Sequence, residues 1–472
     1  MNDRDSQSPF RSPSALTRRR LLGRSLAVGG GALAASAIGP GRGFRAAGAA
    51  AQETPAAGKA SGKLVSWGYG TENPVAEARV NAFKKAFPDV ELEIVPTLED
   101  QKLLTAVASK TVPDLLWLDR FATASWASRS VLMPLTDFVQ RDSYDTSQFY
   151  ESAVSEASWD DQLYGIPGGM DLRVLYVNSD ALNEVGVDPK TIDTGNWDQL
   201  NEVGAKLVKR NGDQVQRWGF DNKLQAGYLY LWGQGNGGHF MNEDATETTF
   251  NDPKNVDALT WGVKTFDDQG GYQSYEAFSS TFQGDEQFAR GLVAMTMYEN
   301  WMLGITARVD PKLNFMVLPI KPRGSTEGAV SYTGGRAWYI PNGAKNPEAA
   351  WEFIKFMHTD DTWLLAANAL KESRKKEGQP FIPTMTGSKT ADQAQLDNVY
   401  ETFSEPFDNA VKLFPEILSQ SVNREISRSP AGSLIDSVLN DEGVLPALRK
   451  EKDPQQALDD ANTAAQDEID SL

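Results

Sequence analysis

Short apolar runs alternate with amphipathic helical stretches along the chain from residue 64 onward. Residues 64–69, 90–94 and 114–119 predict strands, and Asn73-Pro74 predicts the start of the helix between the first two. Because successive strand–helix–strand units form parallel sheets with right-handed crossovers, we expect an α/β fold. Further strands are expected at 172–178, 291–298, 313–320 and 337–341, and Asx-Pro pairs predict helix starts at 252–253, 346–347 and 453–454.

The composition excludes several classes of protein. The chain of 472 residues is 40% hydrophobic, as folded globular proteins are, and its net charge of −18 disfavours binding to nucleic acid or anionic lipid. Cysteine is absent, which excludes disulfides, thiolate metal sites and cysteine nucleophiles. The sequence has only two histidines, His239 and His358, so it offers too few imidazoles for a zinc site with two or three histidines and little material for a histidine-based triad. We therefore expect no metal, no cofactor and no nucleic acid partner.

The first 50 residues differ from the rest of the chain. They hold eight arginines and two aspartates, and the consecutive arginines 18–20 precede a stretch of small apolar residues over 25–38. This order predicts a signal peptide over 1–50, followed by a small-residue tether over 51–61. The arginine run resembles a twin-arginine (Tat) signal, with ordinary secretory (Sec) export as the alternative. Since no stretch reaches the ~20 apolar residues of a membrane span and no cysteine offers a lipid anchor, we expect a soluble periplasmic or otherwise extracytoplasmic protein.

A set of segments in a fixed order carries a family resemblance. The set spans roughly residues 62–370 and consists of 64–88, 113–119, 164–167, 175–178, 197–200, 334–335 and 346–353. In this order the segments resemble extracellular solute-binding protein family 1. Its members are maltose-binding-protein-like substrate-binding proteins of sugar ABC importers.

The resemblance implies a two-lobed periplasmic-binding-protein fold of type II. Each lobe is expected to be a mainly parallel sheet flanked by helices, with a hinge between the lobes and the ligand in the cleft. Lobe 1 is expected over 62–171 plus 336–376, and lobe 2 over 172–335 plus 377–472. The hinge crossings are expected near 170–174, 332–337 and 376–381. The implied partners are a carbohydrate ligand and the membrane permease of an ABC transporter, and the protein is expected to be a monomer.

Candidate ligand residues follow from where strands end. In open α/β sheets the ligand lies beyond the carboxyl ends of the strands, and a sugar needs flat rings together with carboxylates, amides or arginines. Strand ends and glycine-rich crossings then select Trp67, Tyr69, Glu72, Asp119, Arg120, Asp171, Trp232, Glu299, Asn300, Trp301, Gly334, Gly335 and Arg336.

Each candidate also has a structural interpretation. Trp67 and Tyr69, two apart on one strand, are expected to point to the same side, in the cleft or in the core. Glu72 could interact with a helix N-terminus, Asp119-Arg120 could be a surface ion pair, and Trp232 follows a tyrosine-rich stretch. The run 299–301 is the strongest candidate because acid, amide and ring are consecutive. Asp171 and the glycines 334–335 could serve the hinge instead of the ligand.

The predicted function is capture of a sugar or oligosaccharide without catalysis. The lobes would close over the ligand, and the closed form would deliver it to the permease. One alternative is a receptor of the same fold for another solute such as a polyamine, for which Asp119, Asp171 and Glu299 would supply carboxylates. A second alternative is a secreted glycoside-cleaving enzyme, since carboxylates near aromatic rings are also what a glycosidase needs.

Overall fold

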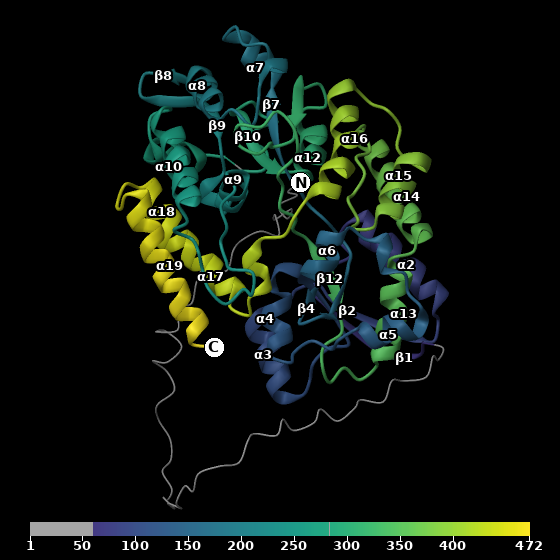
Figure 1. Cartoon of the computed structure of the whole chain (residues 1–472). Coiled ribbons are helices and arrows are strands. Elements are labelled where there is room, and N and C mark those ends of the chain that lie inside the picture. The colour runs from purple at the N-terminus through teal and green to yellow at the C-terminus, as the bar shows by residue number, and fades with distance from the viewer. Residues whose placement is uncertain (1–59, 283) are drawn as a thin grey trace, which may run out of the picture. The chain divides into compact units, whose positions relative to one another are not determined.

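The computed structural model describes residues 60–282 and 284–472. The predicted signal peptide and all but the last two residues of the predicted tether lie outside the described residues. Within the described part of the chain, no helix combines the length and the apolar character needed to cross a bilayer. The described chain forms two five-stranded sheets covered by helices (Figure 1).

The first sheet has the strand order β2-β1-β3-β12-β6. Strands β1 and β2 run parallel, as do β1 and β3, whereas β12 is antiparallel to both of its neighbours. Large side chains are buried on both faces of this sheet. Leu64, Phe83 and Trp338 lie in the cluster on one face, and Leu116 and Tyr339 lie in the cluster on the other. The strands are β1 (Gly62–Trp67), β2 (Val90–Val95), β3 (Leu115–Asp119), β6 (Gly165–Pro167) and β12 (Arg336–Tyr339).

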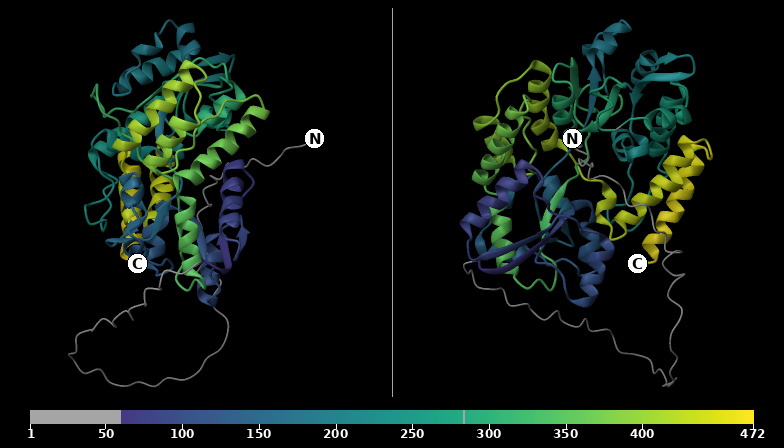
Figure 2. Two further views of the ribbon diagram at one scale, coloured as in Figure 1. Left: turned by 90° about the vertical axis from the view of Figure 1, so that its right-hand side faces the viewer. Right: turned by 180° about the vertical axis from the view of Figure 1, so that it is seen from behind.

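Helices from two distant parts of the chain accompany this sheet. Helix α14 packs on α2, and α13 contacts both α2 and β1, so residues beyond 340 return to complete the first unit (Figure 2). The helices and short strands of this unit are α2 (Pro74–Ala86), α3 (Asp100–Ser109), η1 (Arg120–Ala122), α4 (Thr123–Ser128), α5 (Thr136–Asp142), η2 (Thr146–Gln148), α6 (Glu151–Glu156), β4 (Ser158–Trp159), β5 (Gln162–Leu163), α13 (Pro347–Met357) and α14 (Asp360–Lys376).

The second sheet has the strand order β11-β7-β10-β9-β8. Only β10 and β9 are parallel neighbours, and the other pairs are antiparallel. The expectation of mainly parallel sheets is therefore wrong for this unit, because β7 returns from the crossing against the direction of β10. The strands are β7 (Arg173–Asn178), β8 (Lys209–Asn211), β9 (Gln214–Asp221), β10 (Val293–Glu299) and β11 (Phe315–Leu318).

The second sheet carries its own buried core. Trp218, Trp232, Trp261 and Phe266 lie in one apolar cluster that also takes in the C-terminal helices. Its helices are α7 (Ser179–Glu184), η3 (Pro189–Thr191), α8 (Trp197–Leu207), η4 (Leu224–Ala226), α9 (Leu229–Gly235), α10 (Pro253–Asp267), α11 (Tyr272–Ser279), α12 (Met302–Val309), α16 (Glu405–Gln420), η5 (Glu425–Arg428), α17 (Gly432–Val438), the π-helix η6 (Leu439–Val444), α18 (Leu445–Leu448) and α19 (Pro454–Asp470).

Most elements predicted from the sequence are confirmed. All seven predicted strands are present within a few residues, as β1, β2, β3, β7, β10, β11 and β12. The Asx-Pro pairs also begin helices as predicted. Each Asx side chain accepts a hydrogen bond from a backbone N–H of the first turn, as Asn73 does from Ala76 at 2.9 Å. Strand β9 was not predicted, since Arg217 and Asp221 interrupt its apolar pattern.

Two crossing segments join the sheets where they were expected. The first runs between β6 and β7 and the second leads into β12, and Asp171 and Gly334 pair between them in an antiparallel bridge. A third crossing at 376–381 does not agree with the structure, because Phe381 and Val399 still pack against α14. The chain reaches the second sheet with α16, which packs on β11, and its next residues pair with the second crossing through Tyr332 and Val422.

Candidate functional site

The end of β3 lies beside the two crossing segments. Asp119 is its last residue, and its carboxylate accepts a hydrogen bond from the Phe121 N–H at 3.0 Å. Arg336, the first residue of β12, stands opposite Asp119 in the strand register. Cross-strand partners have Cβ atoms about 5 Å apart, so these two half-buried residues are neighbours at this edge of the sheet.

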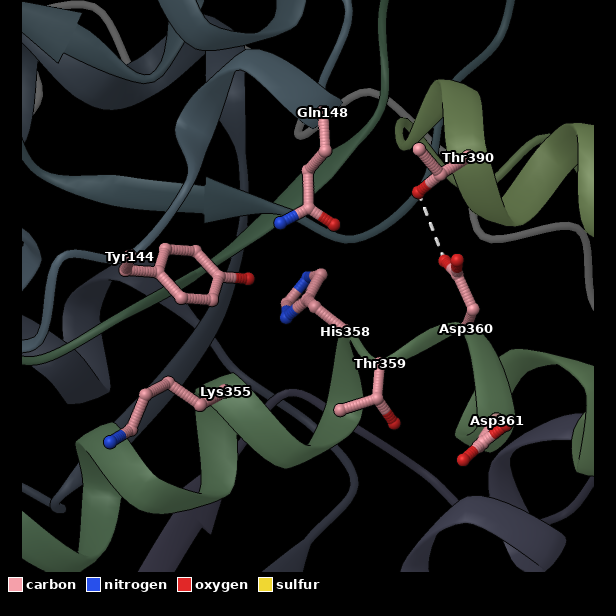
Figure 3. Close-up of a pocket in the computed structure, with 8 residues that line it drawn as sticks. All are labelled: Tyr144, Gln148, Lys355, His358, Thr359, Asp360, Asp361 and Thr390. Carbon is pink, nitrogen blue, oxygen red and sulfur yellow. Dashed lines mark hydrogen bonds between the residues drawn. The ribbon is translucent and has the colours of Figure 1, made fainter.

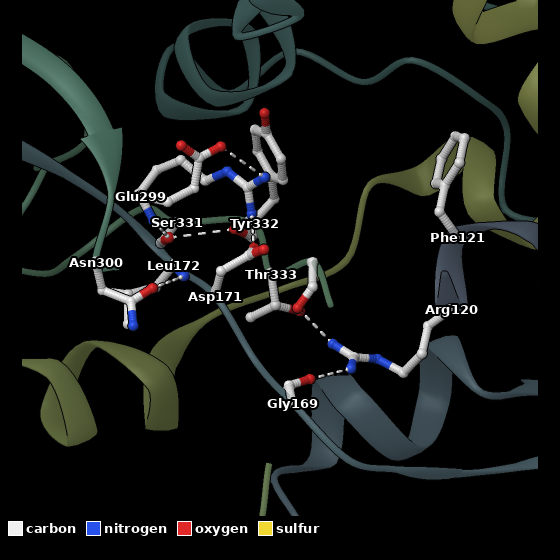
Figure 4. Close-up of polar contacts among 12 residues, drawn as sticks. Arg120, Phe121, Gly169, Asp171, Leu172, Glu299, Asn300, Ser331, Tyr332 and Thr333 are labelled. Carbon is white, nitrogen blue, oxygen red and sulfur yellow. Dashed lines mark hydrogen bonds and ion pairs between the residues drawn. The ribbon is translucent and has the colours of Figure 1, made fainter. Parts of the chain in front are cut away.

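Arg120, the next residue, points inward. Its guanidinium donates to the carbonyl oxygens of Gly169 at 2.6 Å, Gly334 at 2.6 Å and Arg336 at 3.2 Å. Figure 4 shows the bond to Gly169. Its Nε lies 3.2 Å from the Glu156 carboxylate, and both side chains are completely buried. Arg120 therefore holds backbone, and the prediction that it pairs with ligand hydroxyls is not supported.

The acid of that pair is electrostatically unusual. Burial raises the pKa of the Glu156 carboxyl to about 7, although Arg120 and Arg424 lower it. A proton thus binds this carboxyl within the neutral range, next to the guanidinium that contacts both crossing segments.

The end of β10 repeats the arrangement in the second sheet. Glu299 ends the strand, stands opposite Arg173 in the register and accepts from it at 3.4 Å. Arg173 also donates to the Asp171 carboxylate and to the Tyr332 carbonyl oxygen, the latter at 3.2 Å. Asp171 is buried, and its carboxylate accepts the hydrogen bond from Arg173 at the first crossing.

The consecutive run 299–301 does not face one cavity. The Asn300 side chain turns away from Glu299, and its Oδ1 accepts from the Leu172 N–H at 3.0 Å (Figure 4). Asn300 and Trp301 line a different cavity of about 200 Å³, together with Met170, Arg308 and Arg374 among others. Strand β10 ends at Glu299, and Asn300 and Trp301 follow it at the turn into α12, so the period-two alternation of a strand no longer governs where the amide and the ring point.

The predicted aromatic pair is also divided. Trp67 lies half-buried under Lys102, whose ammonium is 4.4 Å from the ring centroid, in the cluster on one face of the first sheet. Tyr69 is buried in the cluster on the other face and contacts Trp117 and Trp338 at 5.4 and 4.7 Å between ring centroids. The expectation that both point to one side is wrong because β1 ends at Trp67 and Gly68 has a φ of +91°, which breaks the alternation.

Trp232 is a core residue. It is fully buried in α9, its indole donates to the Asn222 carbonyl oxygen at 2.9 Å, and it packs on Trp261 and Trp197. The prediction that it contacts ligand is wrong in this structure, since the glycines after it end a helix instead of forming a rim.

The remaining candidates lie at the crossing or on the surface. Glu72 is exposed just before α2 and folds over Gly70, where a Cβ would meet its carboxylate. Gly334 accepts from Arg120 and pairs with Asp171. Gly335 has a φ of +127°, and a Cβ there would lie 2.3 Å from the Gly169 carbonyl oxygen, so only glycine fits this close approach.

Several residues near the crossings were missed from the sequence. They form cation–ring contacts. The Arg173 guanidinium carbon lies 4.1 Å from the Tyr332 ring centroid, and that of Arg424 lies 3.6 Å from Phe121. Lys223 lies 5.0 Å from the half-buried Tyr298 ring, next to Glu299. Tyr298 and Tyr332 were detectable as aromatic neighbours of predicted positions, whereas Arg424 comes from a C-terminal segment with no local signal.

A second cavity lies away from this region. It has a volume of about 320 Å³, and Tyr144, Gln148, Lys355, Asp361 and Thr390 are among the residues that line it (Figure 3). Thr390 donates to Asp360 at its edge at 3.0 Å. None of the predicted ligand residues lines it. No cluster of His, Asp and Glu side chains suited to a metal ion occurs within the described residues.

Comparisons with known proteins agree on the kind of protein. A family model of bacterial extracellular solute-binding proteins matches residues 61–362. The arabinooligosaccharide-binding protein of Bacillus subtilis (strain 168) is 24% identical over 429 residues, which are 85% of this chain and 93% of that protein. The lactose-binding protein of Rhizobium radiobacter is 22% identical over 311 residues, 64% of this chain and 71% of that protein.

Solved structures show the same fold. CpMnBP1 with mannotriose bound superimposes with a TM-score of 0.69 at 24% identity, covering 85% of this chain and 99% of that chain. An ABC substrate-binding protein from Listeria monocytogenes in complex with cycloalternan gives a TM-score of 0.70 at 21% identity, covering 87% and 100%. The two-lobed fold of type II periplasmic binding proteins is thereby confirmed. Since the family model matches more than half of its residues, the chain belongs to the bacterial extracellular solute-binding proteins.

Proposed function

We propose that the protein is the exported substrate-binding protein of an ABC importer and captures a sugar or oligosaccharide between two lobes. The sugars for which its relatives and structural neighbours are named support this class of ligand: arabinooligosaccharide, lactose and mannotriose. The proposed lobes keep the limits 62–171 plus 336–376 and 172–335 plus 377–472, except that residues 377–400 stay with α14. Export by the N-terminal signal and delivery by a monomer to the membrane permease belong to the same proposal.

One observation carries the proposal. In each sheet one strand ends beside the crossing segments in a partly buried carboxylate that stands opposite an arginine in the strand register, Asp119 opposite Arg336 and Glu299 opposite Arg173. The Tyr298 ring adjoins the second pair, and Lys223 lies against that ring. Carboxylates and guanidinium groups bind adjacent hydroxyls, and an aromatic face covers the C–H groups of a sugar ring.

Both lobes have to contribute for capture to close the hinge. A ligand shifts a two-state equilibrium only through its different affinity for the two states. Asp119 and Arg336 supply contacts from one sheet, and Glu299 and Tyr298 supply them from the other. A bound sugar that bridges these groups favours the closed state, because they come together around it only there.

A thermal-shift and calorimetry panel tests the proposal. The panel contains mannotriose, maltotriose, lactose and an arabinooligosaccharide, with spermidine as the competing class. A sugar at 100 times its dissociation constant stabilises the folded protein by about 2.7 kcal/mol. Stabilisation by spermidine alone would overturn the carbohydrate assignment, and release of shorter sugars on prolonged incubation would overturn binding without catalysis.

Variants locate the site for any sugar that binds. Asp119→Asn and Glu299→Gln are each expected to weaken binding at least tenfold, since each removes a charge-assisted hydrogen bond. Glu416→Gln, an exposed acid on α16 away from both pairs, is the matched control and should bind as the unsubstituted protein does. Equal affinities for all four proteins would place the ligand elsewhere.

A further inference from the structure

Two arginines grip the crossing segments from opposite ends. Arg120, at the end of β3, donates to the carbonyl oxygens of Gly169 on the first segment and of Gly334 and Arg336 on the second. These three bonds fasten both segments to the first sheet. The side chain is completely buried, so the contact is internal to the fold.

Arg173 makes the corresponding contacts at the start of β7. Its guanidinium donates to the Asp171 carboxylate on the first segment and to the Tyr332 carbonyl oxygen on the second. Its backbone N–H donates to the Ser331 hydroxyl at 2.9 Å. The same two segments are thus fastened a second time, here to the second sheet.

Only a short stretch of each segment lies between the two grips. On the first segment the grips are at Gly169 and Asp171, which leaves Met170, and on the second they are at Tyr332 and Gly334, which leaves Thr333. Asp171 and Gly334 also join the segments to each other through N–H···O bonds of 3.1 and 3.3 Å. A third segment follows the same stretch, since the Thr333 N–H donates to the Val422 carbonyl oxygen at 2.9 Å.

We infer that Arg120 and Arg173 are positioning residues that clamp the crossing segments to their own lobes and confine hinge bending to the links at Met170 and Thr333. Arg120 acts on the ligand only through the hinge, because it holds backbone carbonyl oxygens and the buried Glu156. Arg173 also donates to Glu299, so Arg120 gives the cleaner test of the clamp. This role rests on the proposed function, since it concerns the closure by which that function works.

The planar fork of arginine is what the clamp requires. Arg120 uses Nη1 for Gly169 and Arg336, Nη2 for Gly334 and Nε for Glu156. A lysine keeps the positive charge but has one nitrogen, which cannot reach acceptors spread over the sides of a guanidinium. Arg120→Lys and Arg173→Lys therefore remove the multiple hydrogen bonds of the clamp while they keep the positive charge.

Hydrogen exchange on the full-length, ligand-free chain tests the inference. In both lysine variants the amides of 168–172 and 332–335 are expected to exchange at least tenfold faster, with the amides of β1 and β9 within threefold of the unsubstituted protein. Arg217→Lys is the matched control, because Arg217 is equally buried but donates to Leu207 and Glu184, away from the crossings. It should leave the crossing amides unchanged.

A distance measurement provides a second readout. The chain has no cysteine, so Lys84→Cys on α2 and Thr260→Cys on α10 accept a pair of spin labels, one beside each sheet. In Arg120→Lys the distribution of label distances is expected to be at least twice as wide. If that variant fails to fold, Glu156→Gln loosens the same guanidinium without removing it and is expected to speed the crossing amides about threefold.

The outcomes separate the two proposals. Unchanged crossing amides, or equal acceleration throughout the chain, would overturn the clamps even if mannotriose binds. Accelerated crossing amides in a protein that binds no sugar would leave the clamps in place and overturn the carbohydrate function.

Discussion

The two strands that end beside the crossing segments, β3 and β10, finish in the same way. Each ends in a half-exposed carboxylate, Asp119 or Glu299, followed by a buried side chain that holds backbone, Arg120 or Asn300. They differ in charge and reach. Arg120 is cationic and contacts three carbonyl oxygens on both crossing segments, whereas the neutral Asn300 contacts the single peptide unit of Leu172.

The difference shows what a side chain needs in order to contact both crossing segments at once. The buried guanidinium lies against a buried acid, Glu156, which ionises only near neutral pH, whereas the amide has no such partner. In the second sheet the longer reach comes from a separate residue, Arg173, which is accompanied by Asp171 and Glu299 at the edge of the site. The first sheet thus keeps its acid–arginine pair in the interior, and the second keeps its pair beside the proposed ligand site.

The largest effect should separate the two holding residues directly. Arg120→Ala is expected to lower the free energy of unfolding by about 3–5 kcal/mol, because it leaves Glu156 buried without its partner. Asn300→Ala should cost about 1–3 kcal/mol, since it abandons one backbone N–H. Urea denaturation measures both, and Arg336→Ala, a half-exposed arginine, is the control expected within about 0.5 kcal/mol. Equal losses for Arg120→Ala and Asn300→Ala would break the comparison.

The pH dependence of stability should also differ between the two strand ends. Because the pKa of Glu156 is raised to about 7, the folded state keeps a proton that the unfolded state releases near pH 4.5. The stabilisation that this bound proton gives the folded state is fully present below pH 4.5 and is lost as the pH rises to about 7. Over that range the free energy of unfolding falls by up to about 1.4 kcal/mol per pH unit. Glu156→Gln should reduce this slope relative to the unsubstituted protein, and the buried carboxyl of Asp392, whose pKa burial also raises to about 7, accounts for a part that remains.

The groups that face Glu156 define the control for this measurement. Arg120 and Arg424 lower its pKa, Asp119 and Asp171 raise it, and Asn300 is not among the groups that act on it. Asn300→Ala should therefore keep the full slope. Urea titrations at several pH values between 5 and 8 measure it, and an unchanged slope in Glu156→Gln would show that this carboxyl is ionised throughout.

The elements of the fold were predictable because their signals are local. Asn73 and Asp252 cap helices through atoms two or three residues away, and apolar runs such as 114–119 become buried strands wherever they pair. The antiparallel direction of β7 was not predictable in this way. It depends on which strands the crossing segments bring together, and no short window of sequence contains that information.

The sequence predicted which residues follow the strand ends but not which way their side chains point. The rule of strand ends selected Asp119 and Glu299, which lie beside the crossing segments and stay candidates for ligand contact. It also selected Arg120, Asn300 and Tyr69, which turn inward, because alternation and a positive φ at Gly68 decide orientation one residue at a time. Arg424 meets Tyr332 only through a tertiary contact, so no local sequence pattern indicated that Arg424 lies here.

A smaller effect should distinguish two glycines at the same crossing. Gly335→Ala is expected to cost about 1–3 kcal/mol, since φ is +127° and the new Cβ would meet the Gly169 carbonyl oxygen that Arg120 holds. A Cβ at Gly169 would meet nothing within 4 Å, so Gly169→Ala should be neutral or slightly stabilising. Thermal unfolding measures both. Tolerance of Gly335→Ala would mean that the segments are less tightly joined than the Arg120 contacts imply.

The smallest effect on stability should come from the two carboxylates that end the strands. Asp119→Asn keeps an acceptor for the Phe121 N–H, and Glu299→Gln leaves Arg173 with Asp171, so each should change the free energy of unfolding by less than about 1 kcal/mol. Their binding of mannotriose or another sugar should nevertheless fall at least tenfold. Replacing a residue that holds the fold lowers the stability of the protein, whereas replacing a residue that contacts the ligand lowers the affinity for the sugar. If Asp119→Asn destabilises the protein as much as Asn300→Ala does, the carboxylate belongs to the holding group, and the division of labour at β3 fails.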